Sequence, residues 1–264
     1  TVGEDNVIRI WEIATGELLL SWIGHGEGEV GGLFTGTMDV SYSPDGQHLA
    51  TSGTDGIAKV WDADTGEEVL AMDGHTDGLF FIAYSPDGTM IATSSDQADT
   101  TVKVWDAESG AEIYTLEGHP VRVFGLAFSP DSRLLATSGF QGVVKLWDMT
   151  TGKEIYTLPS QISTVANVSF SPDGQQLITS GGDALRVWDV ATGEELKTIA
   201  VDRFGIDLTQ DGRYLYASHP RDGVVRVYTL LLADTIALAQ QRLTRSLTVE
   251  ECQQYLHVNV CPEE

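Results

Sequence analysis

The chain has 264 residues, of which 15 are Lys or Arg and 39 are Asp or Glu, so that its formal net charge is -24. Such an acidic surface disfavours nucleic acid and anionic lipid as ligands, because both are held by clustered Lys and Arg. No apolar run reaches the roughly 18 to 20 residues that a membrane span requires. We therefore expect a protein that binds neither nucleic acid nor a membrane, and whose charge serves solubility or attracts a basic partner.

The first 22 residues indicate an incomplete structural unit. Residues 1–13 have turn and strand character and lack the charged-then-apolar pattern of a signal peptide, so we expect the chain to begin inside a domain. One strand is expected to end near Trp11, and a second is expected from Leu18 to Trp22. These two strands are predicted to be the outer half of a sheet whose inner strands precede residue 1.

An internal repeat organises the chain up to about residue 230. Aromatic residues, each followed by an acidic residue or Thr, recur every 40 to 50 residues: Trp11-Glu12, Trp61-Asp62, Trp105-Asp106, Trp147-Asp148, Trp188-Asp189 and Tyr228-Thr229. A second series keeps phase with the first: Ser43-Pro44-Asp45-Gly46, Ser85-Pro86-Asp87-Gly88, Ser129-Pro130-Asp131-Ser132, Ser171-Pro172-Asp173-Gly174 and Thr209-Gln210-Asp211-Gly212. Pro, Asp and Gly supply the backbone geometry of tight turns, so the second series predicts one hairpin connection per repeat.

Short runs rich in β-branched and aromatic residues lie between the turns, as in Leu49 to Ser52, Ala58 to Trp61 and Leu177 to Ser180. These runs predict about four antiparallel strands per period. Four short strands cannot close a core alone, whereas radial stacking of successive sheets buries their faces and protects their edges. The predicted fold class is therefore all-β: a β-propeller of four-stranded antiparallel blades that forms one domain over residues 1–232.

Gly74-His75, Ser85-Pro86-Asp87-Gly88, Asp99 and Trp105-Asp106 resemble the signature of the WD-repeat family, and the resemblance extends from residue 1 to about residue 230. It implies that each repeat supplies three inner strands to one blade and the outer strand to the next. By this count the chain holds about five and a half blades, whereas rings of this family mostly resemble seven. A six-bladed ring completed by the C-terminal tail is the alternative.

The resemblance also implies a structural hydrogen-bond chain of His, Ser or Thr, Asp and Trp inside each blade. It assigns this tetrad to His25, Ser52, Asp55 and Trp61, and again to His75, Ser94, Asp99 and Trp105. The next repeat offers His119, Ser138 and Trp147 with Gln141 in place of Asp, and the one after offers Ser180, Asp183 and Trp188 without a His. Hydrolases use the same residue types as base, nucleophile and orienting group, but recurrence once per blade favours the structural role.

Partner contacts are expected from loops at one rim of the ring, because loops on a rigid scaffold often carry binding residues. The loop between Gly26 and Thr37 is longer than its counterparts in the following repeats. The candidates in this and the later loops are Glu27, Glu29, Leu33, Phe34, Asp77, Leu79 and Arg122. The alternative for the long loop is a tolerated insertion without a role.

The pattern changes after Leu232, and residues 233–264 are predicted to form a short helical tail. Apolar residues recur at helical spacing from Ile236 to Leu247. The stretch from Leu243 to Thr248 and the residues beyond resemble the tail of large bacterial WD-repeat signalling proteins, which carry a STAND-type NTPase, kinase or regulator domain upstream. This resemblance implies a bacterial, cytoplasmic setting. Cys252, His257 and Cys261 are irregularly spaced, so no metal site is expected there.

These features predict a scaffold for protein interactions, or a sensory module of a larger signalling protein, and no enzyme. The expected partner is a protein, a peptide or an upstream domain of the same polypeptide, and no cofactor is expected. The alternative is a ligand-binding or enzymatic propeller with its site at the axial channel. Unpaired His, Asp or Glu side chains at the channel mouth would favour that alternative, whereas exposed Phe and Leu surrounded by polar groups would favour protein docking.

Overall fold

The computed structural model describes residues 1–3, 5–26, 36–96, 98–158, 164–181 and 184–200, and beyond them three strands at 206–208, 214–219 and 224–229. The chain divides into two compact units, Thr1–Asp202 and Arg203–Glu264, and each is described by itself. The described residues form strands β1 to β21 and one short 3-10 turn, so the class is all-β as predicted. They include no helix with the length and apolar character that a membrane crossing needs. The predicted helical tail and its boundary at residue 232 lie outside the described residues.

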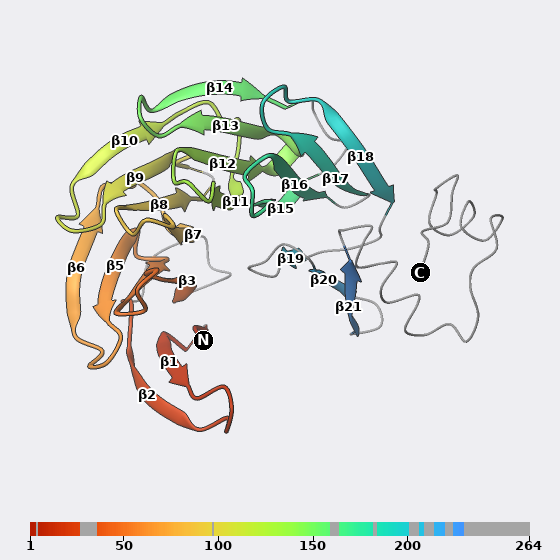
Figure 1. Ribbon diagram of the computed structural model, residues 1–264. Helices are drawn as coiled ribbons and strands as arrows, with labels where there is room; N and C mark the ends of the chain where they lie inside the picture. The colour runs from red at the N-terminus through yellow and green to blue at the C-terminus, as the bar shows by residue number, and fades with distance from the viewer. Residues whose placement is uncertain are drawn as a thin grey trace, which may run out of the picture. The chain divides into compact units, whose positions relative to one another are not determined.

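The first unit contains one two-stranded and four four-stranded antiparallel sheets. The small sheet pairs β1 (Val7–Trp11) with β2 (Leu18–Ile23). The strands of the larger sheets are β3 (Thr37–Tyr42), β4 (His48–Gly53), β5 (Ile57–Asp62) and β6 (Glu68–Asp73); β7 (Leu79–Tyr84), β8 (Met90–Ser95), β9 (Val102–Asp106) and β10 (Glu112–Leu116); β11 (Val123–Phe128), β12 (Leu134–Gly139), β13 (Val144–Asp148) and β14 (Lys153–Thr157); and β15 (Val165–Phe170), β16 (Gln176–Gly181), β17 (Ala184–Asp189) and β18 (Glu195–Ala200). Figure 1 shows the first strand of each larger sheet innermost and the fourth strand outermost, as in propeller blades.

The second unit contains one described sheet of three strands, β19 (Ile206–Leu208), β20 (Tyr214–His219) and β21 (Val224–Thr229). The sheets therefore follow the predicted order of an incomplete first blade, four complete blades and three inner strands of another. This order results from local turn signals that recur in each repeat. The seven-bladed ring stays a prediction.

The Ser-Pro-Asp-Gly tetrapeptides form the turns between the first and second strands. In the first of them, Ser43 Oγ donates to Asp45 Oδ1 at 2.6 Å and accepts from the amide of His48 at 2.9 Å. Gly46 has a φ of 73°, a left-handed conformation that favours glycine because it has no Cβ. The polar side chains thus close the turn and fix the register of the strands that follow.

The apolar core lies between consecutive sheets. Trp105 of the β7–β10 sheet packs among Val60, Met72 and Leu79, which belong largely to the preceding sheet. Trp147 and Trp188 occupy the corresponding positions at the next two junctions. Each sheet buries its apolar face only against its neighbours, and this is why the repeat must be stacked to be stable.

The innermost strands also contact one another directly. Asp39 Oδ2 in β3 accepts from the amide of Ile82 in β7 at 3.1 Å, and Ser41 Oγ accepts from the amide of Tyr84 at 3.1 Å. The unit has two opposite faces. The loop face carries the connections between sheets and those between second and third strands, such as 74–78 and 96–101; the turn face carries the remaining turns, such as 43–46 and 62–66.

Candidate functional site

Buried histidines tie the loop face to the interior of the first two complete sheets. His25 Nδ1 lies 3.0 Å from Asp55 Oδ1, and its Nε2 lies 2.8 Å from Thr51 Oγ1. Trp61 Nε1 donates to the same threonine oxygen at 2.8 Å. The next sheet repeats this arrangement with His75, Asp99, Thr93 and Trp105, at distances of 2.8 to 2.9 Å.

The donors and acceptors of these atoms fix the direction of the chain. An indole nitrogen can only donate, so Thr51 Oγ1 accepts from Trp61, and the same oxygen is hydrogen-bonded to His25 Nε2. A carboxylate can only accept, so the Nδ1–H of His25 donates to Asp55. Burial would raise the pKa of Asp99 in the equivalent chain, but hydrogen bonds from Thr101, the amide of Thr76 and His75 together lower it to about 2.

The chain is shorter in the third and fourth complete sheets. His119 Nε2 lies 2.7 Å from Thr137 Oγ1, which accepts from Trp147 Nε1 at 2.9 Å. Gln141 stands where Asp55 stands, and within the described residues the buried Nδ1 of His119 has no hydrogen-bond partner. Burial, with a contribution from the charge of Lys145, lowers the pKa of His119 to about 4.

In the fourth complete sheet, Trp188 Nε1 donates to Thr179 Oγ1 at 2.9 Å. No His precedes this sheet at the position that His25 and His75 occupy, as the sequence indicates. The predicted member Asp183 lies outside the described residues.

The predicted hydroxyl of the tetrad was wrong by one position. Ser52, Ser94, Ser138 and Ser180 were assigned, whereas the shared oxygen belongs to the preceding threonine in every case. Successive side chains of a strand point to opposite faces, so only one of the two neighbours can face the tryptophan. The serines face the other way; Ser52 Oγ, for example, donates to the carbonyl of Phe80 in the next sheet at 3.1 Å.

The histidine chain has no exposed nucleophile. Thr51 and Thr93 are fully buried, and each hydroxyl is already shared between a tryptophan and a histidine. The described residues also contain no group of three or more His, Cys, Asp or Glu side chains that could hold a metal ion. This arrangement serves to tie the loops to the sheets.

Four phenylalanines and an arginine form a different kind of cluster on the loop face. This aromatic patch consists of Phe80, Phe81, Phe124, Phe140 and Arg122. Ring centroids are 6.5 Å apart for Phe80 and Phe81, 6.5 Å for Phe81 and Phe124, and 6.2 Å for Phe124 and Phe140. The guanidinium carbon of Arg122 lies 4.5 Å from the ring centroid of Phe80 and 5.8 Å from that of Phe124.

A β-bulge explains how two of these rings come to lie near the loop face. The pairing of β7 with β8 skips Phe80, and the pairing of β11 with β12 skips Phe124. A bulge leaves one residue out of the ladder and re-aims its side chain. Phe140 lies in the 3-10 turn Phe140–Gly142 after β12, and 48% of its surface is exposed.

The arginine of the patch is held in a fixed position. Besides stacking on two rings, Arg122 forms an ion pair with Asp96, which is buried at the end of β8. The Arg122 side chain is 21% exposed, so its guanidinium is accessible to a partner while these contacts hold it in place. Aromatic residues and arginine are among the residue types that contribute most of the binding energy at protein interfaces.

The structure places the predicted partner-binding residues in different environments. Leu79 was wrong, because its side chain is fully buried in the core between the first two complete sheets. Asp77 lies on the loop face, where its carboxylate accepts from the amides of Gly78 and Ala98. Arg122 belongs to the aromatic patch. The remaining candidates lie outside the described residues: Glu27, Glu29, Leu33 and Phe34.

The phenylalanines of the patch were missed. Phe80 and Phe124 occupy the same position in successive repeats, one residue after the start of the innermost strand. That repetition is visible in the sequence, but strand alternation alone does not reveal the bulge that exposes them.

Comparison with known families gives a match over most of the first unit. Residues 16–62, 66–106, 110–148 and 152–189 each match the family described as WD domain, G-beta repeat, and together they cover more than half of the chain. A comparison with curated proteins gives no match.

Proposed function

The chain belongs to the WD-repeat family, and on that premise we propose that its first unit is a docking platform for another protein or a peptide. WD-repeat propellers generally hold partner proteins on a rigid scaffold. The observation that carries the proposal for this chain is the aromatic patch on the loop face. A partner side chain placed there gains apolar contact with the rings and a fixed cation beside them.

The patch has the physical features of an interface hot spot. Aromatic residues and arginine are enriched among the residues whose truncation weakens protein complexes most. Phe140 offers an exposed ring, while Phe81 and Phe124 form the partly buried surface beneath it. Because Arg122 is already held by Asp96 and two rings, a partner does not have to immobilise it, which reduces the entropy lost on binding.

The alternative function is a ligand-binding or enzymatic propeller with a site at the axial channel. That reading calls for convergent His, Asp or Glu side chains at the channel mouth. The described loop face instead gathers rings and one arginine between β7 and β11, and its histidines belong to buried chains. This contrast favours docking over catalysis.

We further propose that the platform works in the cytoplasm as a sensory or regulatory module of a larger bacterial signalling polypeptide. The support for this setting is the likeness of the stretch from Leu243 onward to the tails of such proteins. In that case the occupant of the aromatic patch is an upstream domain of the same polypeptide, and isolation of the native protein tests it by the mass of the chain.

Two matched truncations test the docking proposal. Phe140→Ala removes an exposed ring from the aromatic patch, whereas Tyr42→Ala removes a ring of similar exposure, 51%, from the turn face. Tagged wild-type and variant chains are used to capture partners, and each captured protein is quantified by mass spectrometry. Thermal unfolding of each variant confirms that the fold is kept.

The expected result is a loss of about tenfold or more in capture of the specific partner by Phe140→Ala, as for a hot-spot residue. Tyr42→Ala should leave capture of the same partner within about twofold of the wild type, because most interface-distant truncations have little effect. Equal effects of both substitutions, or no effect of Phe140→Ala, would contradict docking on the aromatic patch.

A further inference from the structure

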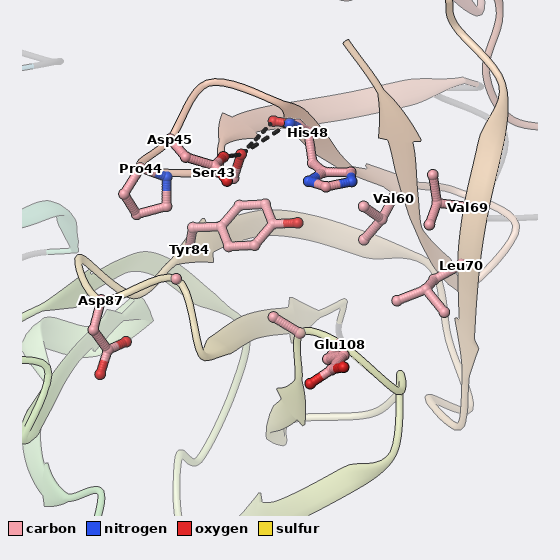
Figure 2. Close-up of a pocket in the computed structure, with 12 residues that line it drawn as sticks. Ser43, Pro44, Asp45, His48, Val60, Val69, Leu70, Tyr84, Asp87 and Glu108 are labelled. Atoms are coloured by element: carbon pink, nitrogen blue, oxygen red, sulfur yellow. Dashed lines mark hydrogen bonds between the residues drawn. The ribbon is translucent and has the colours of Figure 1, made fainter.

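A pocket of about 430 Å³ opens on the turn face between the first two complete sheets. Val60, Val69 and Leu70 of β5 and β6 line one side, and Tyr84, Ala107 and Glu108 of the following sheet line the other. Figure 2 shows the Tyr84 ring reaching into this space with its hydroxyl directed toward His48 and Val60, and Glu108 on the opposite side from His48. The volume falls within the range of roughly 300 to 1,000 Å³ that is typical of ligand pockets.

The equivalent positions at the next two junctions explain why this pocket is open. Strand register aligns Leu70 with Tyr114 and Tyr156, because each pairs with the residue before the repeat tryptophan. At the second junction Met90, Tyr114, Phe128 and Met149 pack into one core cluster, and at the third Leu134, Tyr156, Phe170 and Val190 do the same. The first junction has His48, Leu70, Tyr84 and Ala107 at these positions, and the last three also pack against its core cluster. Leu70 and Ala107 are smaller than Tyr114 and Met149, and they leave a space between the two sheets open.

At the third junction, a tyrosine occupies the space that stays open at the first. Tyr156 reaches across it and donates from its hydroxyl to the carbonyl of Val190 at 2.8 Å. A hollow of about 350 Å³ remains there, lined by the two Ser-Pro-Asp turns and Leu134, and by neither Tyr156 nor Val190. The pocket at the first junction extends from the turns to an apolar wall formed by Val69 and Leu70 of β6.

Several polar side chains line the pocket. Within the described residues, the hydroxyl of Tyr84, the imidazole of His48 and the carboxylate of Glu108 make no side-chain hydrogen bond. Glu108 is replaced by Thr150 and Ala191 at the equivalent positions of the next two sheets. The pocket thus offers hydrogen-bonding groups and a charge that its filled counterparts lack.

The electrostatic field in the pocket is negative. Asp45 and Asp87 lie on its rim together with Glu108, and the lining residues include no Lys or Arg, so that His48 is the one lining side chain able to carry a positive charge. Burial, and to a smaller extent the charge of Asp45, raises the pKa of the Tyr84 phenol to about 12. A negative field over an apolar wall and an aromatic ring is complementary to a cation on an aliphatic stem.

We infer that this pocket binds the side chain of a lysine or arginine from a basic segment of a partner protein. The aliphatic stem would lie along Val69 and Leu70, and the cationic head would reach Glu108 and the hydroxyl of Tyr84. The pocket lies on the face opposite to the aromatic patch, so the inference does not depend on the proposed docking there, and either one can fail alone.

Methyl NMR of the whole chain, labelled at valine and leucine methyl groups, tests the inference. The probe is Nα-acetyl-lysine N-methylamide, and the control is its norleucine analogue, which has an aliphatic side chain but no ammonium group. Probe is added up to about 20 mM, where even a complex with a Kd of about 10 mM is two-thirds formed. We expect saturable shifts at the methyl groups of Val60, Val69 and Leu70 with the lysine probe.

Two variants complete the test. Glu108→Thr, which copies the neighbouring sheet, should weaken binding of the lysine probe by about two- to fivefold, as expected for one partly exposed ion pair. Leu70→Tyr with Ala107→Met fills the pocket with the residues of the second junction and should abolish the shifts at Val60 and Val69. Unchanged indole signals confirm the fold; if the double variant does not fold, Glu108→Thr and the norleucine control decide alone.

Four outcomes would overturn the inference. The lysine probe could cause no saturable shift at these methyl groups, the norleucine analogue could bind equally well, or Glu108→Thr could leave the affinity unchanged. A response of the filled variant equal to that of the wild type would place binding elsewhere on the acidic surface and would overturn it as well.

Discussion

Replacing Thr93 by Val is expected to destabilise the fold far more than replacing its neighbour Ser94 by Ala. Both side chains are fully buried. Thr93 Oγ1 accepts from Trp105 Nε1 at 2.8 Å and lies 2.9 Å from His75 Nε2. Ser94 Oγ makes a single contact of 3.4 Å with the carbonyl of Val123, which is long for a hydrogen bond.

The magnitude follows from the atoms that are left unpaired. Valine has nearly the shape of threonine, but it leaves the indole N–H of Trp105 without an acceptor and His75 Nε2 without a donor. Each buried polar atom left unpaired costs about 1 to 3 kcal/mol, so the two together should lower the free energy of unfolding of Thr93→Val by about 2 to 6 kcal/mol. Ser94→Ala removes one weak hydrogen bond and should lower it by about 1 kcal/mol or less.

Urea unfolding of the wild type and both variants, followed by tryptophan fluorescence, measures the two differences. The indole N–H signal of Trp105 gives a local check by NMR, since its exchange with solvent should accelerate in Thr93→Val and stay unchanged in Ser94→Ala. Equal losses in both variants, or a larger loss in Ser94→Ala, would refute the assignment of threonine as the shared oxygen of the chain.

Three further predictions concern the chains and contacts between sheets. Gln141→Asp offers the buried Nδ1 of His119 a carboxylate, so the pKa of His119 should rise from about 4 and the free energy of unfolding should increase by about 1 kcal/mol; an NMR titration that finds no rise would contradict this. Burial raises the pKa of Asp39 from 3.8 to about 6, so its ionisation opposes folding, and stability should fall by about 3 kcal/mol as the pH rises from about 4 to above 6. Asp39→Asn has no carboxyl group here, so its stability should not show this fall. Urea unfolding at pH 4 and pH 7 measures the difference in free energy of unfolding, and an equal difference in the wild type and in Asp39→Asn would contradict the prediction. Amide exchange should be faster in β19 to β21, where Tyr228 replaces the repeat tryptophan, than in β3 to β10; uniform protection would refute the link between tetrad completeness and local stability.

The order of strands and sheets could be predicted because its signals are local. The Ser-Pro-Asp turns and the Trp-Asp pairs each act within a few residues of the chain, and their period gives the grouping of strands into sheets. The structure places β1 and β2 where the sequence predicted an incomplete sheet, with Trp11 at the end of β1. Turn chemistry and alternation therefore carry enough information for the architecture.

The candidate site depended on neighbours that are about 40 residues away in the chain. Phe80, Phe124 and Phe140 come from two repeats and meet only after their sheets are stacked, with bulges that alternation does not predict. Leu79, one residue before Phe80, was expected on the surface and is instead in the core between sheets.

The sequence by itself determined that the chain is a stack of small antiparallel sheets, because each turn and strand forms from residues close in the chain. The tertiary structure decided which of two adjacent hydroxyls, Thr51 or Ser52, meets Trp61. The two point to opposite faces of β4, and the pairing of Leu49 with Trp61 in β5 puts Thr51 on the tryptophan's face. It also decided that the space beside Leu70 and Ala107 stays open, while larger side chains occupy the equivalent positions at the next two junctions. An open space is a property of side chains from two sheets together, and neither repeat alone contains it.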